Sequence, residues 1–125
     1  MKKSEFYLNV VKGRENNHYP KVNGYIETVT DSKGIQSLII GYDKRNEGCW
    51  MATELNTGFC VSQGTFETRK KCAENVHSNI DVIVDVYNKK MTDEKYYESY
   101  IKPYEDYVSA NEIWMFNGEL LIPYS

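Results

Sequence analysis

The sequence has few of the residues that usually build a catalytic centre. Its 125 residues include two histidines and three cysteines, and no cysteine pair has CxxC spacing. Neither a GxGxxG motif nor a Walker A glycine loop is present. Cys60 alternates within a predicted strand and Cys72 lies on an apolar helical face, so we expect both to pack in the core rather than to act as nucleophiles. The sequence therefore predicts a non-enzymatic protein that has no cofactor.

Long apolar runs are also missing. No stretch approaches the roughly 20 apolar residues that a membrane-spanning helix needs. The first residues contain two lysines, as a signal peptide does, but an acidic residue, Glu5, follows them. No apolar run of signal-peptide length comes after it. An odd number of cysteines fits free thiols in a reducing compartment. We therefore expect a cytoplasmic protein that does not contact the membrane.

The charge is unevenly distributed. The net charge is −3, but residues 1–71 hold 11 basic and 8 acidic side chains, whereas residues 72–125 hold 4 and 10. Tyrosine is abundant, with eleven residues against four phenylalanines. A ring that carries a hydroxyl suits half-buried and contact positions. These features favour binding by charged and tyrosine-rich surfaces.

The first half of the chain predicts an antiparallel meander of four or five strands. Short runs rich in β-branched and aromatic residues alternate with turn residues such as DSKG, KRNEG and NTG. The expected strands are residues 5–11, 25–30, 35–43, 49–55 and 58–63.

From Thr65 the apolar residues recur at helical spacing. Thr65 is the expected N-cap of one long amphipathic helix that ends near Lys90. A second helix starts near Thr92, and Pro103 predicts a kink or two short helices. Asn117–Gly118 then predicts a C-terminal hairpin. The whole chain, 1–125, is expected to form a single α+β domain. The long helix would bury Cys72, Ala73, Val76, Ile80, Ile83, Val84 and Tyr87.

One group of residues on the long helix has metal-ligand character. His77, Asp81 and Asp85 are spaced four residues apart, which places them along one side of a continuous helix. Imidazole and carboxylate groups can share a divalent metal. However, no second cluster supplies the remaining ligands, so we favour a solvated helix edge and predict no metal site.

The segment 92–112 interleaves carboxylates with tyrosines. On one interpretation, a tyrosine stripe packs on the sheet while the carboxylates face water. On the other, the two form a contact surface for a protein partner, with negative charge where the phosphates of a nucleic acid would lie. The residues expected to bind such a partner are Asp93, Glu94, Tyr97, Glu98, Tyr100, Tyr104, Glu105, Asp106 and Tyr107.

Basic residues provide the alternative, a small nucleic-acid-binding regulator. Clustered cations bind phosphates if the fold brings them together. A pI near 5.4 argues against this function, so direct nucleic-acid binding ranks below protein binding. The candidate phosphate-binding residues are Lys44, Arg45, Arg69, Lys70 and Lys71, with Lys12 and Arg14 as further members of the cluster.

Residues 50–76 resemble small accessory proteins of phages and mobile elements. The shared pattern is a Trp-containing strand, a TG turn, a second strand, and Gly-Thr opening a helix with basic residues. The corner formed by Gly58, Cys60, Gly64 and Thr65 is also similar to one in HicB-type antitoxins, which continue with acidic residues and alanine where this chain has Arg69–Lys71. The resemblance implies a phage or mobile-element setting in a bacterial cell, and it carries over no active-site residue. With the acidic segment, it leads us to expect an anti-CRISPR-like inhibitor of a bacterial nuclease or nucleic-acid-binding complex.

Overall fold

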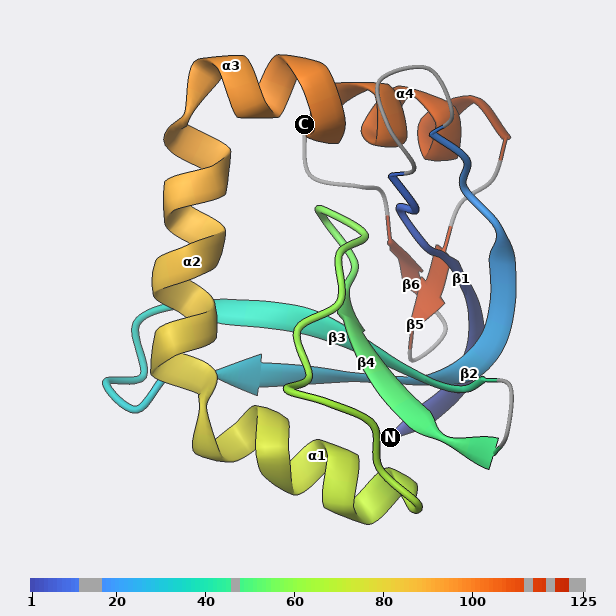
Figure 1. The fold of residues 1–125 in the computed structure, drawn as a ribbon, viewed down its shortest axis with the longest axis vertical. Coiled ribbons are helices and arrows are strands. Elements are labelled where there is room, and N and C mark those ends of the chain that lie inside the picture. The colour runs from blue at the N-terminus through green and yellow to red at the C-terminus, as the bar shows by residue number, and fades with distance from the viewer. Residues whose placement is uncertain (12–16, 46–47, 112–113, 117–118, 122–125) are drawn as a thin grey trace.

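A four-stranded antiparallel sheet with helices on it confirms the predicted α+β class. The computed structural model describes residues 1–11, 17–45, 48–111, 114–116 and 119–121. The strands follow chain order across the sheet, as in a simple meander (Figure 1). They are β1 (Lys2–Tyr7), β2 (Lys21–Thr30), β3 (Ser37–Lys44) and β4 (Trp50–Glu54).

The predicted fifth strand of this sheet, residues 58–63, is not formed. The segment makes a single isolated bridge to β4, between Thr53 and Cys60. Gly58 and Gly64 have φ angles of 73° and 97°, so both ends of the segment depart from extended backbone. The result is a loop that lies beside β4. The first strand is also shifted, since it begins at Lys2 rather than at residue 5.

The predicted long helix is two helices, α1 (Arg69–Ser78) and α2 (Ile80–Thr92). Asn79 leaves helical geometry, with φ −112° and ψ 14°, and the two axes diverge there (Figure 1). The N-cap is Thr68 rather than Thr65, since the Thr68 side chain accepts a hydrogen bond from Lys71 N. The predicted apolar residues nevertheless share one core, because α1 and α2 cover the same face of the sheet. Among them, Cys72, Val76, Ile80, Ile83 and Val84 are buried, with Ala73 and Tyr87 packed against them.

Pro103 interrupts the second helical segment as predicted. The segment consists of α3 (Glu94–Tyr96), the π-helical turn η2 (Tyr97–Ile101) and α4 (Lys102–Asn111). Lys102 N donates to Tyr97 O, five residues back, immediately before the proline. Proline has no N–H to continue a regular α-helical ladder, so the wider turn is placed where that ladder fails.

Two further strands pair near the end of the chain. β5 (Trp114–Phe116) and β6 (Glu119–Leu121) are antiparallel. The predicted Asn117–Gly118 turn lies outside the described residues, so the complete hairpin stays a prediction.

The sheet separates two apolar cores. The first lies between the sheet and α1 and α2. The second lies on β1 and α4, where Phe6, Ile26, Leu55, Tyr104 and Val108 are fully buried. Helices therefore pack on both faces of the sheet, and α1 and α4 lie toward opposite ends of the long axis of the molecule (Figure 1).

Two glycines test the geometry of the loop beside β4. A Cβ atom added at Gly58 would lie 2.6 Å from Asn9 Cβ and from Tyr104 Cε1, whereas one at Gly64 would have no neighbour within 4 Å. Gly64→Ala should therefore cost only the left-handed backbone strain, about 1 kcal/mol. Gly58→Ala should cost at least about 2 kcal/mol more, because it adds a clash with a fixed ring. Urea unfolding measures both, and equal losses would contradict this packing.

Candidate interaction sites

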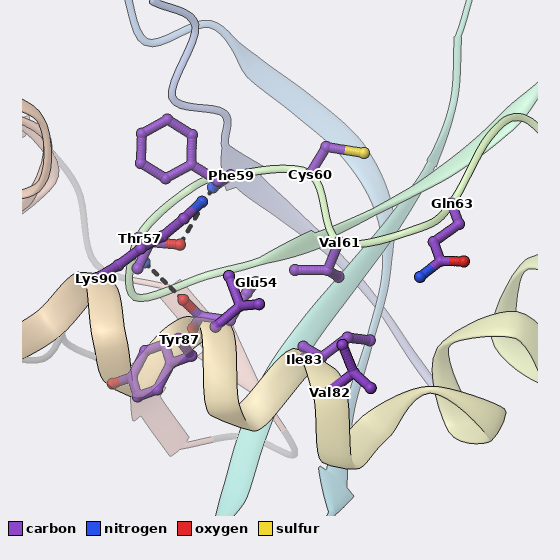
Figure 2. Close-up of a pocket in the computed structure, with 11 residues that line it drawn as sticks. Glu54, Thr57, Phe59, Cys60, Val61, Gln63, Val82, Ile83, Tyr87 and Lys90 are labelled. Carbon is purple, nitrogen blue, oxygen red and sulfur yellow. Dashed lines mark hydrogen bonds between the residues drawn. The ribbon is translucent and has the colours of Figure 1, made fainter.

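An apolar groove lies between α2 and the loop beside β4. Its volume is about 150 Å³, and its walls are mainly Phe59 and Val61 from the loop and Val82, Ile83 and Val86 from α2 (Figure 2). Val82 and Val86 are 55% and 44% exposed, which is unusual for aliphatic side chains one helical turn apart. The groove and these two valines form one continuous apolar surface, which we call the valine groove.

The groove exists because α2 has apolar residues outside its core stripe. Ile83 points to the sheet, and a helix turns by about 100° per residue, so Val82 and Val86 point to one side of that stripe. The facing wall is held by backbone hydrogen bonds from Gly58 N to Glu54 O and from Val61 N to Ala52 O.

Glu54 lies beneath the groove and shapes the turn that forms its wall. This carboxyl is 1% exposed, and its two oxygens accept hydrogen bonds from Asn56 N at 2.6 Å and Thr57 N at 2.8 Å. Burial raises the pKa of Glu54 to about 7, although the two N–H donors oppose that rise. The groove therefore has a buried carboxyl that titrates near neutral pH.

Lys90 connects the valine groove to α3. Its ammonium lies 4.6 Å from the ring centroid of Phe59 and 5.6 Å from that of Tyr96. Burial lowers the pKa of Lys90, and the carboxyl of Glu54 partly offsets the effect. The Phe59 and Tyr96 rings also contact each other, at 6.0 Å between centroids. The groove and the start of α3 thus form one surface.

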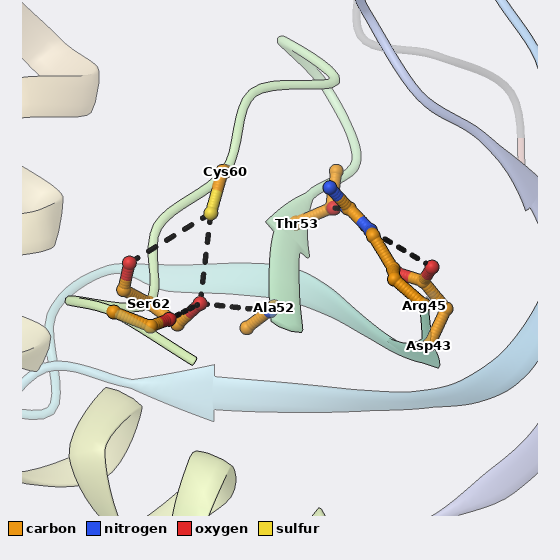
Figure 3. A network of polar contacts seen from close by, with 7 residues as sticks. Asp43, Arg45, Ala52, Thr53, Cys60 and Ser62 are labelled. Atoms are coloured by element: carbon orange, nitrogen blue, oxygen red, sulfur yellow. Dashed lines mark hydrogen bonds and ion pairs between the residues drawn. The ribbon is translucent and has the colours of Figure 1, made fainter. Parts of the chain in front are cut away.

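The loop also carries a small polar network (Figure 3). Ser62 Oγ accepts a hydrogen bond from Ala52 N at 3.1 Å, and Cys60 Sγ lies 3.5 Å from the same oxygen. Cys60 is exposed, which corrects the expectation that it packs in the core. Cys72 is buried as predicted, and burial raises the pKa of its thiol to about 11, which disfavours the reactive thiolate. Its role is packing.

The structure divides the predicted partner-binding residues into exposed and buried groups. Tyr104 and Glu105 are buried, so they do not belong to a contact surface. Tyr104 Oη donates to the carbonyl oxygens of Tyr7 and Leu55, and Tyr97 Oη donates to Glu105 Oε2 at 2.7 Å. The exposed carboxylates are Asp93, Glu94, Glu98 and Asp106; Tyr107 is 39% exposed, and Tyr97 and Tyr100 are half-buried.

The predicted basic residues are only partly brought together. Arg45 forms an ion pair with the buried Asp43 at 3.0 Å, so its guanidinium has a structural role (Figure 3). Lys44 stands opposite Trp50 in the β3–β4 ladder. Its side chain lines a hollow beside Asp43, which is not the hollow that Trp50 lines. Arg69 and Lys70 share a hollow with Trp50, and Lys71 is exposed on α1. Lys12 and Arg14 lie outside the described residues.

The structure does not bring the three candidate metal ligands together at one site. His77 Nε2 lies 2.9 Å from Glu27 Oε1, whereas Asp81 accepts hydrogen bonds from Ser32. Asp85 is exposed on α2, beyond the break at Asn79. In the described part of the chain, no group of three His, Cys, Asp or Glu side chains has an arrangement that could hold a metal.

The sequence interpretation missed the valine groove. Val82 and Val86 interrupt an otherwise polar outer surface of α2, and this departure from the core stripe was the available signal. The sequence gives no signal for the opposite wall, because its local pattern predicts a strand at residues 58–63.

Comparisons with protein-family models, curated proteins and solved structures found no match for this chain. None of its described helices has the length and apolar character needed to cross a bilayer.

The titration of Glu54 makes folding stability depend on pH. A carboxyl whose pKa rises from 4.5 to about 7 on folding keeps its proton in the native state while the unfolded chain loses it. Stability should therefore fall by about 3 kcal/mol as pH rises from 4.5 to 7 and then level off. Burial also raises the pKa of Glu105, so that group contributes in the same direction.

Glu54→Gln should flatten this dependence relative to the wild type, while Glu67→Gln, at an exposed position, should leave it unchanged. Urea unfolding across this pH range measures the effect. A Glu54→Gln protein with the wild-type pH profile would contradict it.

Proposed function

We propose that this protein is a non-enzymatic inhibitor of phage or mobile-element origin that acts in the bacterial cytoplasm. Its partner is a nucleic-acid-handling defence enzyme, in the manner of an anti-CRISPR protein. The valine groove is the observation that carries the proposal, because an exposed apolar patch with a polar rim is typical of a protein-binding site.

The surroundings of the groove have the composition of a protein interface. Such interfaces combine an apolar centre with a charged and aromatic rim. Here Val82 and Val86 supply the centre, while Lys90 and Tyr96 connect it to the exposed Asp93 at the start of α3. A partner that covers the groove would therefore also meet the first acidic residues of the helical segment.

The acidic residues supply the proposed specificity for an enzyme that handles nucleic acid. The exposed side chains of residues 93–111 include four carboxylates against two lysines, Lys95 and Lys102. Lys102 already pairs with Asp106 at 3.2 Å, which leaves Asp93, Glu94 and Glu98 as carboxylates on a surface next to half-buried tyrosines. Negative charge and tyrosine rings complement an arginine- and lysine-lined groove that normally holds phosphates.

The first test is protection of a phage from a defence nuclease. Expression of the protein in bacteria whose CRISPR nuclease targets that phage should raise plating efficiency at least about tenfold. The same phage without a matching target sequence should plate equally well with and without the protein. Unchanged plating across strains with different nuclease types would contradict the proposal.

The second test disrupts the groove. Val86→Asp places a charge at the apolar centre and should weaken partner binding at least about tenfold, the effect of losing about 1.4 kcal/mol. Ile35→Asp is the matched control, since Ile35 is 79% exposed on the β2–β3 turn, outside the groove. Binding is measured with the partner recovered by pull-down, and circular dichroism checks folding. Equal binding by the two folded variants would show that the groove is not the contact site.

The third test concerns the acidic residues. Glu94→Lys combined with Glu98→Lys should reduce partner binding at least about tenfold, because both reverse charge on the proposed surface. Glu5→Lys combined with Glu67→Lys makes the same change in net charge elsewhere, at exposed positions, and should have little effect. Similar losses in both double variants would indicate a general charge effect and would contradict a specific acidic surface.

A further inference from the structure

A second surface, at the other end of the long axis, combines cations with aromatic rings. Trp50, Arg69, Lys70 and His77 line a hollow of about 710 Å³ between β4 and α1. The Arg69 guanidinium lies 3.7 Å from the ring centroid of Tyr25 and 6.0 Å from that of Trp50. We call this surface the Trp50 hollow.

The sheet adds a third cation. Lys3 stands directly opposite Tyr25 in the β1–β2 ladder, so both side chains are on the same face of the sheet. The Arg69 guanidinium thus lies over the Tyr25 ring, and Lys3 projects from the position opposite Tyr25 on the same face of the sheet. This convergence joins the first residues of the chain to the start of α1 and depends entirely on the fold.

These three cations have no ion-pair partner among the described residues. The ion pairs found there use Lys21, Arg45, His77 and Lys102 instead. The chain has a net charge of −3, so three unpaired cations on one surface are a local feature and not a consequence of overall charge. Unpaired cations beside a hollow favour an anionic ligand.

The aromatic rings narrow the class of anion. Proteins that bind single-stranded nucleic acids combine cations for the phosphates with aromatic side chains on which bases stack. Trp50 is half-buried and lines the hollow, and its ring lies 6.3 Å from that of Tyr25. The volume is within the range of small-molecule sites. Glu74 also lines the hollow; its carboxylate repels phosphate, but it can accept a hydrogen bond from the amino group of a base.

We infer that the Trp50 hollow binds a nucleotide, with the base against Trp50 and the phosphate held by Lys3, Arg69 and Lys70. The nucleotide is either free or one unit of a single strand. The inference is independent of the proposed inhibitory function, because none of these residues belongs to the valine groove or to α3 and α4.

The experiment measures binding of three probes: a fluorescent single-stranded DNA 12-mer by anisotropy, and ATP and tripolyphosphate by calorimetry. For a strand, we expect a Kd of about 1–100 µM and a slope of log K against log salt between about −0.7 and −2, depending on whether the three cations neutralise one phosphate or up to three successive ones. If the 12-mer binds and ATP does not, the site takes a nucleotide only as part of a strand. If ATP binds, the site also takes free nucleotides. Either probe should bind more tightly than tripolyphosphate, which has no base.

Lys70→Glu should weaken binding at least about tenfold. Lys95→Glu is the matched control, since it makes the same charge change on α3, and it should change affinity less than twofold. Both lysines are exposed, so folding should be retained. The inference is overturned if neither the 12-mer nor ATP binds at 50 mM salt, if tripolyphosphate binds as tightly as ATP and the 12-mer, or if the two variants lose affinity equally.

Discussion

The buried side chain of Tyr104 holds the helical segment 94–111 onto the sheet. Its ring is fully buried against Gly58, and its hydroxyl donates to carbonyl oxygens at the ends of β1 and β4. A buried hydroxyl without such partners would cost free energy, so the two hydrogen bonds favour this position in addition to the burial of the ring. Asn9 supports the same junction through hydrogen bonds from its side-chain nitrogen to Thr57 O and Tyr100 O.

This anchor decides which parts of the segment reach the solvent. Once Tyr104 points inward, Glu105 and Val108 are buried beside it. The opposite side of α4 carries Asp106, and the acids of α3 stay exposed. Tyr107 remains at the edge, where its ring contacts those of Tyr7 and Tyr19 at 5.5 Å and 5.0 Å between centroids. The packing interpretation of the tyrosine stripe thus holds in part, because Tyr104 is buried, whereas the contact-surface interpretation stays a prediction.

Glu54 has a comparable role for the valine groove, since its carboxyl organises the turn that brings Phe59 opposite α2. The break at Asn79 has the complementary effect, because it lets α2 run toward α3 while α1 stays near Trp50. The fold thus presents an apolar and acidic surface at one end and a basic, aromatic surface at the other.

Local patterns in the sequence determined the α+β class, the meander of four strands, the interruption at Pro103 and the core residues Cys72, Val76 and Ile83, because periodicity and backbone restrictions act between near neighbours. The same patterns predicted a helix N-cap at Thr65 and a strand at residues 58–63. In the structure the N-cap is Thr68, and residues 58–63 form a loop. Only the tertiary structure decided that Tyr104 and Glu105 are buried and that Arg45 forms an ion pair with Asp43. It also decided that Arg69 lies over the Tyr25 ring and that Lys3 is on the same face of the sheet as Tyr25. These outcomes depend on contacts between residues far apart in the chain, and such contacts are chosen by the packing of the whole core.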